Sequence, residues 1–275
     1  MDTAIYAAAA SALGVTNLKP LGPGGQKLVA VADGPNGQTI VKIVELAPPY
    51  AAVALERARR EVGVLASISH PNVVRLESGL VELGTPPFAV CWREECLDGE
   101  DLEARRGPIH PWAEVAAMAA DVSAGLTAFH DAGAVHRDLS PRNVRCLASG
   151  SHKVMDPGIA RLLAETTITG PVDPGSYGYM SPEHVSPAAR PTFASDVFGL
   201  GILMYEQLTG QCPIPFLGDR ADYSRRLRDD QAPSIVSRRA DLSPAQAKFV
   251  DTCLQRQLAR RYLDAHEALD ALATL

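Results

Sequence analysis

Two stretches near the start of the chain contain residue types that could bind phosphate. Residues 21–25, Leu-Gly-Pro-Gly-Gly, separate two strand-like segments, and glycines in such a loop let backbone N–H groups approach phosphate oxygens. Lys42 follows on the apolar run at 39–44, and Glu61 is its natural counter-charge. Each feature also has an ordinary explanation, because a Gly/Pro cluster is more often a plain turn, a strand lysine can face solvent and a helix glutamate can be a surface charge.

A second group of polar residues lies beyond the middle of the chain. His136, Arg137, Asp138 and Asn143 place an acid and an amide five residues apart in one loop. An exposed loop acid is normally turn chemistry, yet these four residue types at these spacings arise by chance in roughly one sequence in a thousand. Asp156 follows thirteen residues after Asn143, just behind a strand-like pair. The ordered set therefore indicates a chemical site.

The first ninety-odd residues are predicted to form strands around one helix. Short β-branched or aromatic runs occupy 29–32, 39–44 and 88–92, and Asp-Gly-Pro-Asn-Gly at 33–37 is a strong hairpin-turn signal. Residues 51–68 instead repeat apolar side chains at helical spacing among charges, which predicts an amphipathic helix. This part of the chain must position the glycine loop, Lys42 and Glu61.

After about residue 98 the apolar spacing becomes helical. A helix should open at Pro111 and end at Gly133, and the stretch 197–208 is apolar nearly all round, which is typical of a buried helix. Two more helices are expected at 244–254 and 263–273. The pattern predicts an α+β protein with a small sheet-rich lobe, a connector near 95–99 and a larger helical lobe.

Composition excludes several classes of protein. With 46% hydrophobic and 21% charged residues, the chain can bury a sizeable core and is not a disordered segment. A net charge of −6 argues against nucleic-acid binding, and no apolar run reaches the roughly 18 residues of a membrane span. The Ala-rich start lacks the positive region of a signal peptide. Five scattered cysteines without a CxxC pair predict reduced thiols in a cytoplasmic protein.

Taken in order, these motifs resemble those of the eukaryotic-type (Hanks-type) Ser/Thr protein kinase catalytic domain, in its bacterial form. The matching residues run from Gly22 to Arg261, which is nearly the whole chain, and the ordered set is far more specific than any one member. The resemblance implies a bilobal fold, with an N-terminal lobe at 1–97 made of an antiparallel sheet and one regulatory helix. A mainly helical C-terminal lobe would occupy 98–275, and ATP would bind between the lobes.

The resemblance assigns roles to residues of the first lobe. Gly22, Gly24 and Gly25 correspond to the nucleotide-covering loop, and Val29 corresponds to the valine over the adenine. Lys42 matches the lysine that holds the α- and β-phosphates, and Glu61 matches its ion-pair partner on the regulatory helix. In the connector, Glu95 and Leu97 would contact the adenine, provided that Asp98-Gly99 sets the register. A shift of one residue is the alternative, because this register gives Glu94 a buried position.

The resemblance also assigns roles in the second lobe. Asp138 matches the catalytic acid that takes up the substrate hydroxyl proton, and Asn143 and Asp156 match the ligands of Mg²⁺, with Mn²⁺ as a second possible metal. Three further residues match structural positions: Glu183 closes the activation segment, Arg261 is its buried partner and Asp196 supports the catalytic loop.

Several residues depart from the family pattern. Lys27 replaces the third glycine of the loop, Ser140 replaces the usual lysine after the catalytic acid, and Pro157 replaces the phenylalanine after Asp156. Arg142 could supply the cation missing at Ser140 or be a simple surface arginine. Proline is smaller than phenylalanine and fixes φ, so the packing behind Asp156 should be altered.

Three functions are consistent with these features. The first is a signalling protein Ser/Thr kinase whose Arg137 binds a phosphorylated activation segment, with Thr166, Thr167 and Thr169 as candidate autophosphorylation sites. The second is a pseudokinase or binding module, favoured by the three departures. The third is a small-molecule kinase, which the Pro-Glu pair ending at Glu183 and the distal arginine disfavour. ATP and a protein substrate are the expected partners, without nucleic acid or membrane; the substrate and the oligomeric state do not follow from the sequence. A cluster of five arginines in the second lobe is either a docking surface or, more often in such cases, a solvated face: Arg225, Arg226, Arg228, Arg238 and Arg239.

Overall fold

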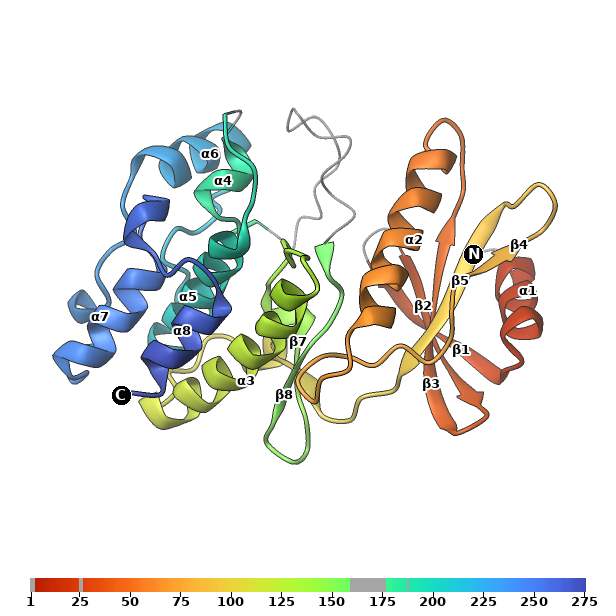
Figure 1. Ribbon diagram of the computed structural model, residues 1–275, viewed down its shortest axis with the longest axis horizontal. Helices are drawn as coiled ribbons and strands as arrows, with labels where there is room; N and C mark the ends of the chain where they lie inside the picture. Colours follow the sequence, from red (N-terminus) through yellow and green to blue (C-terminus); the bar gives the residue numbers. More distant parts are fainter. Residues whose placement is uncertain (1–2, 25–26, 159–176, 187) are drawn as a thin grey trace. The chain divides into compact units, whose positions relative to one another are not determined.

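The computed structural model describes residues 3–24, 27–158, 177–186 and 188–275. These residues form two compact units (Figure 1). The first contains 3–70 and 74–98, and the second contains 71–73, 99–158 and the described residues from 177 onwards. The chain thus passes from one unit to the other after Asp98, within the connector that the sequence indicates.

The first unit is built on a five-stranded antiparallel sheet in the order β1-β2-β3-β5-β4. Its elements, in chain order, are α1 (Thr3–Leu13), β1 (Thr16–Gly24), β2 (Lys27–Gly34), β3 (Gly37–Glu45), α2 (Ala51–Ser67), β4 (Val81–Leu83) and β5 (Ala89–Glu95). The predicted hairpin turn joins β2 to β3, where Gly34 pairs with Gly37. Gly37 has φ 115°, a left-handed conformation that glycine adopts without steric cost.

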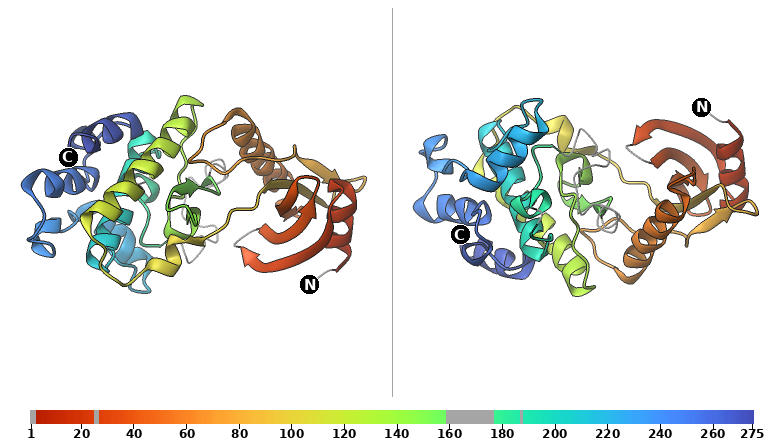
Figure 2. Two further views of the ribbon diagram at one scale, coloured as in Figure 1. Left: turned by 90° about the horizontal axis from the view of Figure 1, so that it is seen from below. Right: turned by 90° about the horizontal axis from the view of Figure 1, so that it is seen from above.

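The two helices of this unit cover opposite faces of the sheet (Figures 1 and 2). Along β3, Val41 and Ile43 pack beneath α1, whereas the side chains between them point to the other face, because a strand alternates its side chains. On that second face Trp92 packs with Ala58 and Val62 of α2. Lys42 is the register partner of Trp92, so it shares the α2 face of the sheet.

The second unit is mainly helical, with one small sheet in the order β6-β7-β8. Its helices and strands are β6 (Glu100–Asp101), α3 (Trp112–Asp131), β7 (Val144–Cys146), β8 (His152–Val154), α4 (Pro182–Val185), α5 (Phe193–Thr209), α6 (Arg220–Asp229), α7 (Pro244–Cys253) and α8 (Ala265–Leu272). Short 3-10 helices add η1 (Leu102–Arg105), η2 (Pro141–Asn143), η5 (Ile235–Ser237) and η6 (Leu258–Arg260).

The centre of the second unit is α5, which contacts α3, α7 and α8 (Figure 2). Fifteen of its residues, from Ala194 to Leu208, are buried. A helix that is apolar nearly all round has no face for solvent, which is the property that the sequence indicated. The helix ends at Gly210, whose φ of 71° is a left-handed cap.

The predicted fold class is confirmed, and so are the helices expected in the sequence. Those helices are α2, α3, α5, α7 and α8, each within a few residues of its predicted bounds. The sequence expectation missed α1, which gives the first unit a second helix, as well as β4, β6, β7, α4 and α6. None of the described helices is long and apolar enough to cross a membrane.

Candidate active site

A buried aspartate fixes the backbone of the loop that carries Asp138. Asp196, in the first turn of α5, accepts hydrogen bonds from the backbone N–H groups of His136 (2.7 Å) and Arg137 (2.8 Å). Its Oδ2 also lies 3.1 Å from Nε2 of His130. These bonds fix the backbone beside Asp138, where Arg137 has a left-handed φ of 67°. Such a conformation in a non-glycine residue costs free energy and persists only where its surroundings impose it.

Asn143 is held against Asp138 by its side-chain amide. The Nδ2 group donates to the backbone carbonyl of Asp138 at 2.7 Å and to its carboxylate Oδ2 at 3.2 Å. Both amide hydrogens are therefore directed at Asp138, and the carbonyl oxygen Oδ1 lies on the other branch of the side chain. An amide in this orientation offers a hard oxygen ligand to a cation such as Mg²⁺.

The β7–β8 hairpin brings Asp156 to the same place. Val144 pairs with Val154, so Asn143 and Met155 flank this pair on the two strands, and the Met155 N–H donates to the Asn143 carbonyl at 2.8 Å. Asp156 follows directly, with a left-handed φ of 51°. Aspartate tolerates this region better than most residues, yet the conformation is strained and turns the chain sharply after β8.

The residues after Asp156 pack directly against the catalytic loop. The Gly158 N–H donates to the His136 carbonyl at 2.7 Å, and a Cβ at Gly158 would lie 2.6 Å from Cβ of Asp138. Only glycine fits this approach. Pro157 is buried, and His136 packs edge-on against Phe129. Burial lowers the pKa of His136, and its ring nitrogens lie near the Asp138 N–H and the Met155 carbonyl, as a neutral imidazole requires.

Asp138 and Asn143 thus come from one loop of the second unit, and Asp156 comes from the turn after β8, which the Met155–Asn143 backbone bond joins to that loop. Two carboxylates and one amide oxygen form a donor set of hard oxygens suited to Mg²⁺ or Mn²⁺. The residues present therefore fit a divalent cation of the type that protein kinases use with ATP.

In the first unit, the predicted phosphate-binding lysine forms a buried ion pair with Glu94. Lys42 Nζ lies 2.6 Å from Oε2 of Glu94, and the two residues are 3% and 2% exposed. Trp92 Nε1 donates to the other carboxylate oxygen at 2.8 Å. The sequence register placed Glu94 in a buried position, where an unpaired carboxylate would be costly. The ion pair and the indole hydrogen bond offset that cost.

The acid expected to pair with Lys42 forms an ion pair with another lysine. Oε1 of Glu61, a buried residue of α2, lies 2.5 Å from Nζ of Lys27 at the start of β2. Lys27 also lies over the ring of Trp92, 5.6 Å from its centroid. The lysine that replaces the third loop glycine is therefore joined to α2. Whether Glu61 also serves Lys42 in catalysis stays a prediction.

The remaining candidates of the first unit lie on β1, β2 and β5 or directly after β5. Gly22 pairs with Val29 and Gly24 with Lys27 across the β1–β2 hairpin, while Gly25 lies outside the described residues. Glu95 ends β5, and its carboxylate accepts the Arg75 N–H at 2.8 Å. Leu97 is half-buried in the connector. Their adenine contacts stay predictions.

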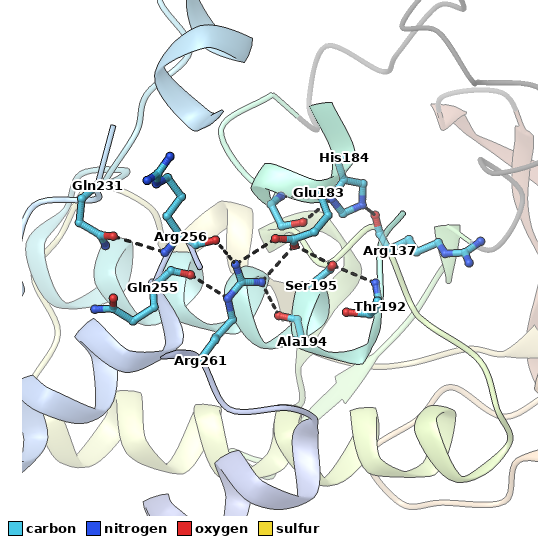
Figure 3. A network of polar contacts seen from close by, with 11 residues as sticks. Arg137, Glu183, His184, Thr192, Ala194, Ser195, Gln231, Gln255, Arg256 and Arg261 are labelled. Carbon is cyan, nitrogen blue, oxygen red and sulfur yellow. Dashed lines mark hydrogen bonds and ion pairs between the residues drawn. The ribbon is translucent and has the colours of Figure 1, made fainter. Parts of the chain in front are cut away.

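Glu183 and Arg261 form a two-pronged ion pair in the interior of the second unit (Figure 3). Both guanidinium-to-carboxylate distances are 3.1 Å, and Ser195 Oγ adds a hydrogen bond to Glu183 at 2.8 Å. Arg261 also donates to the backbone carbonyls of Ala194, Gln255 and Arg256. Burial raises the pKa of the Glu183 carboxyl, but the hydrogen bonds and charge of Arg261 outweigh burial and leave the pKa below its usual value.

His184 is a site residue that the sequence expectation missed. Its Nδ1 accepts the Ser181 N–H at 3.1 Å, and its Nε2 lies 3.1 Å from the Arg137 carbonyl, directly before Asp138 (Figure 3). Since Nδ1 accepts, Nε2 carries the hydrogen and donates to Arg137. His184 fills the N3 position of a capping box on α4. The spacing Ser-x-x-His departs from the usual Ser-x-x-Glu/Gln signature and so gave no signal.

Arg142 lies on the surface of the second unit, and the candidate phosphorylation sites lie outside the described residues. Arg142 is exposed, with Nε 3.9 Å from Glu103, so it stays a candidate phosphate ligand only as a prediction. The three threonines Thr166, Thr167 and Thr169 lie outside the described residues. Ser140, at the position of the missing lysine, is buried and precedes η2.

Most of the arginine cluster of the second unit is neutralised locally. Arg225 and Arg226 pair with Asp222 at 3.0 and 2.7 Å, and Arg239 pairs with Asp241 at 2.8 Å. These contacts favour the solvated, ion-paired face over an acidic docking site.

Comparison with known proteins identifies the class. The model of the protein kinase domain family matches residues 16–271, and the chain therefore belongs to this family. A probable serine/threonine-protein kinase PknB of Lactococcus lactis is 33% identical over 226 residues, covering 81% of this chain and 35% of that protein. The serine/threonine-protein kinase pkn2 of Myxococcus xanthus is 32% identical over 273 residues, covering 93% of this chain and 32% of that protein. The chain thus spans about a third of the length of these relatives.

A solved structure supports the fold. The kinase domain of Mycobacterium tuberculosis PknI superposes with a TM-score of 0.71 and 22% sequence identity, covering 97% of this chain and 98% of that chain. At this identity the likeness concerns the fold, which is the two-unit protein kinase architecture.

Proposed function

We propose that this domain transfers the γ-phosphate of ATP to serine or threonine hydroxyls of a protein substrate. The observation that carries the proposal is the gathering of Asp138, Asn143 and Asp156 by the catalytic loop and the β7–β8 hairpin. In this assignment Asp138 accepts the proton of the attacking hydroxyl, and Asn143 and Asp156 hold Mg²⁺. The five free cysteines support a reducing, cytoplasmic compartment.

Lys42 supplies the cation for the α- and β-phosphates in this proposal. A divalent metal, when bound, neutralises charge on the transferred phosphoryl group, while Asp138 orients the nucleophile. Gly22, Gly24 and Gly25 cover the phosphates with backbone N–H groups, and Glu95 and Leu97 contact the adenine.

The test is transfer of radiolabelled γ-phosphate to the protein itself and to a generic basic protein. Wild type should incorporate label in the presence of Mg²⁺, and D138N and K42M should lose most of it, since one lacks the base and the other the phosphate-binding cation. Equal labelling of all three proteins would show that the label comes from a contaminating kinase and would reject the proposal.

Regulation by autophosphorylation is part of the proposal. Arg137 beside the catalytic acid is suited to bind a phosphorylated residue of the activation segment, and Thr166, Thr167 and Thr169 are the candidates. Intact mass after incubation with Mg-ATP should rise by increments of about 80 daltons. Substituting all three threonines by alanine should remove the increments, and an unchanged mass in wild type would contradict this part.

A second candidate function is nucleotide binding without transfer. It is favoured by buried Pro157 and Ser140, because the residues that they replace in the family support the metal-binding turn and the transferring phosphate. Calorimetric binding of ATP together with no label transfer under any metal would select this function. The variant S140K should then leave transfer absent, whereas in an active kinase it should increase the rate.

A further inference from the structure

Lys42 and Glu94 come from neighbouring strands that hold them at a fixed spacing. In the β3–β5 pairing, Lys42 stands opposite Trp92 and Ile40 stands opposite Glu94. Lys42 and Glu94 are therefore diagonal neighbours on one face of the sheet, close enough for long side chains to meet. Their charged atoms lie 2.6 Å apart.

We propose that Glu94 is a positioning residue for Lys42, which holds the ammonium group in place for ATP and keeps it charged. The proposal rests on the proposed function in that it takes Lys42 as the phosphate-binding lysine. It adds a second acid, supplied by the sheet itself, to the acid of α2 that the family pattern provides. In this proposal, Glu94 of β5 holds Lys42 in addition to the acid of α2 that the family pattern provides.

The surroundings of Glu94 hold its carboxylate in place. Trp92 Nε1 donates to Oε1 at 2.8 Å, and Oε2 lies against the Lys42 ammonium. Thr39 Oγ1 lies 2.9 Å from the Glu94 backbone carbonyl and 2.7 Å from Oε2 of Glu77, so its single hydrogen is shared between these two acceptors. A buried carboxylate with a cation and a hydrogen-bond donor is stabilised in its ionised form. An uncharged residue here would leave Lys42 with less compensation in a buried place.

In the second ion pair on this face, the glutamate comes from the helix α2 and the lysine comes from the sheet. Glu61 of α2 contacts Lys27 of β2, and Lys27 lies over the same Trp92 ring whose N–H binds Glu94. Lys42, Glu94, Lys27 and Glu61 together carry no net charge when all four are ionised, and a further ion pair on this side of the sheet, between Arg59 of α2 and Glu82 of β4, is also neutral. In this arrangement α2 is tied to the nucleotide-covering hairpin, and β5 is tied to Lys42.

The matched experiment compares E94Q with E77Q. Glu77 is a largely buried acid of the same unit that pairs with Arg93. Arg93 is the register partner of Val41, so this pair lies on the face opposite Lys42. The dissociation constant of ATP, measured by calorimetry, should rise 10- to 100-fold in E94Q and less than threefold in E77Q. E94D keeps the charge and should bind ATP better than E94Q. Equal ATP affinity in wild type and E94Q would overturn the proposal, and so would equal losses in E94D and E94Q.

A second measurement needs neither ATP nor activity. In nucleotide-free protein with ¹³C-labelled lysine, the Lys42 signal is assigned by its loss in K42M and followed against pH by NMR. Removal of the Glu94 charge should move this titration to lower pH in E94Q, with Glu61 and Lys27 still present, while E77Q leaves it unchanged. An unchanged Lys42 titration in E94Q would overturn the proposal.

The outcomes separate this inference from the proposed function. If wild type transfers no phosphate but the Lys42 titration moves in E94Q, the proposed function fails and the positioning role stands. If transfer is normal and neither affinity nor titration responds, the positioning role fails alone. Should E94Q not fold, the double variant K42M/E94Q should fold better, because no buried charge is left unpaired; failure to do so would contradict the pair.

Discussion

Among the described residues, each unit has an ion pair in which the cation and the glutamate are both at most 5% exposed, and the two pairs are built differently. In the second unit, Arg261 meets Glu183 through two contacts of 3.1 Å and donates its other hydrogens to three backbone carbonyls. In the first unit, Lys42 meets Glu94 through one close contact of 2.6 Å. Both pairs are nearly inaccessible to solvent.

The difference lies in what each cation can still do. A guanidinium has five donors in a rigid fork, and those of Arg261 are used in binding Glu183 and three backbone carbonyls, with the ring of Phe198 4.8 Å away. An ammonium is a compact charge on a flexible stem that can reorient its three hydrogens. The arginine pair is suited to holding structure, and the lysine pair is suited to holding a cation that a ligand will use.

The largest effect is expected when the arginine pair is broken. R261M leaves Glu183 buried without its counter-charge, and such losses cost about 3–5 kcal/mol of unfolding free energy. Urea unfolding followed by circular dichroism measures this value. R225M, which removes an exposed arginine paired with Asp222, is the control and should cost less than about 1 kcal/mol. A loss in R261M as small as in R225M would show that the fork contributes little.

The next effect concerns activity, and it follows from exchanging the cation of the lysine pair. K42R keeps the charge beside Glu94, so unfolding free energy should stay within about 1 kcal/mol of wild type. The larger planar group cannot place its charge where the ammonium stood, and kcat/KM for ATP should fall about 100-fold, equivalent to about 2.7 kcal/mol. Steady-state kinetics and urea unfolding on one preparation measure both. Loss of stability with normal kinetics would reverse our assignment.

The reciprocal exchange should produce the reciprocal result. R261K keeps a charge beside Glu183 but loses the second prong and the backbone contacts, which should cost about 2 kcal/mol of stability. The kcat/KM of the folded fraction should remain within about threefold of wild type, because the pair touches no reacting group. A 100-fold kinetic loss in R261K at temperatures where the protein is folded would show that the fork also acts in catalysis.

Much of this contrast could be predicted from the sequence, and the reasons for the rest are physical. Arg261 and Glu183 were assigned as partners because the family motifs place them in order, and the structure confirms their contact. Glu94 was placed in a buried position, but its partner depends on side-chain packing across β3 and β5, which spacing along one chain does not reveal. The same holds for Lys27, whose side chain reaches α2 from the adjacent hairpin.

Elements with weak local signals were also missed. The α1 helix has an Ala-rich sequence with little amphipathic contrast, so its role appears only when Ile5, Ala9 and Leu13 pack on the sheet. At the turn that carries Asp156, the residue type was clear from the sequence but the backbone conformation was not. The motif indicates a candidate metal ligand at this position, whereas the strained φ of 51° comes from the surrounding packing.

A pH titration of stability should distinguish the arginine pair from its neutral variant. Because the pKa of Glu183 is lowered in the folded protein, the pair contributes stability above the unfolded pKa, near 4.5, and loses it as pH falls through the folded pKa. The unfolding free energy of wild type should therefore decrease toward low pH by up to about 1.4 kcal/mol per pH unit more steeply than that of E183Q. Parallel curves for the two proteins between pH 3 and 6 would contradict the lowered pKa.

The smallest effect is expected at His184, which connects the Glu183 region to the catalytic loop. H184A removes both the cap on Ser181 and the hydrogen bond to the Arg137 carbonyl, so it should lower stability by about 1 kcal/mol and kcat about tenfold. H184N keeps an acceptor oxygen near the position of the imidazole Nδ1, so it can still accept the Ser181 N–H, but its side chain ends short of the Nε2 that donates to Arg137. It should recover the stability while kcat stays a fewfold below wild type, with KM for ATP unchanged. H266Q changes an exposed histidine of α8 that pairs with Asp131 and should leave all three quantities unaltered. If H184N recovered both stability and kcat, the contact of His184 with Arg137 would have no part in placing Asp138, and His184 would not connect the arginine pair to catalysis.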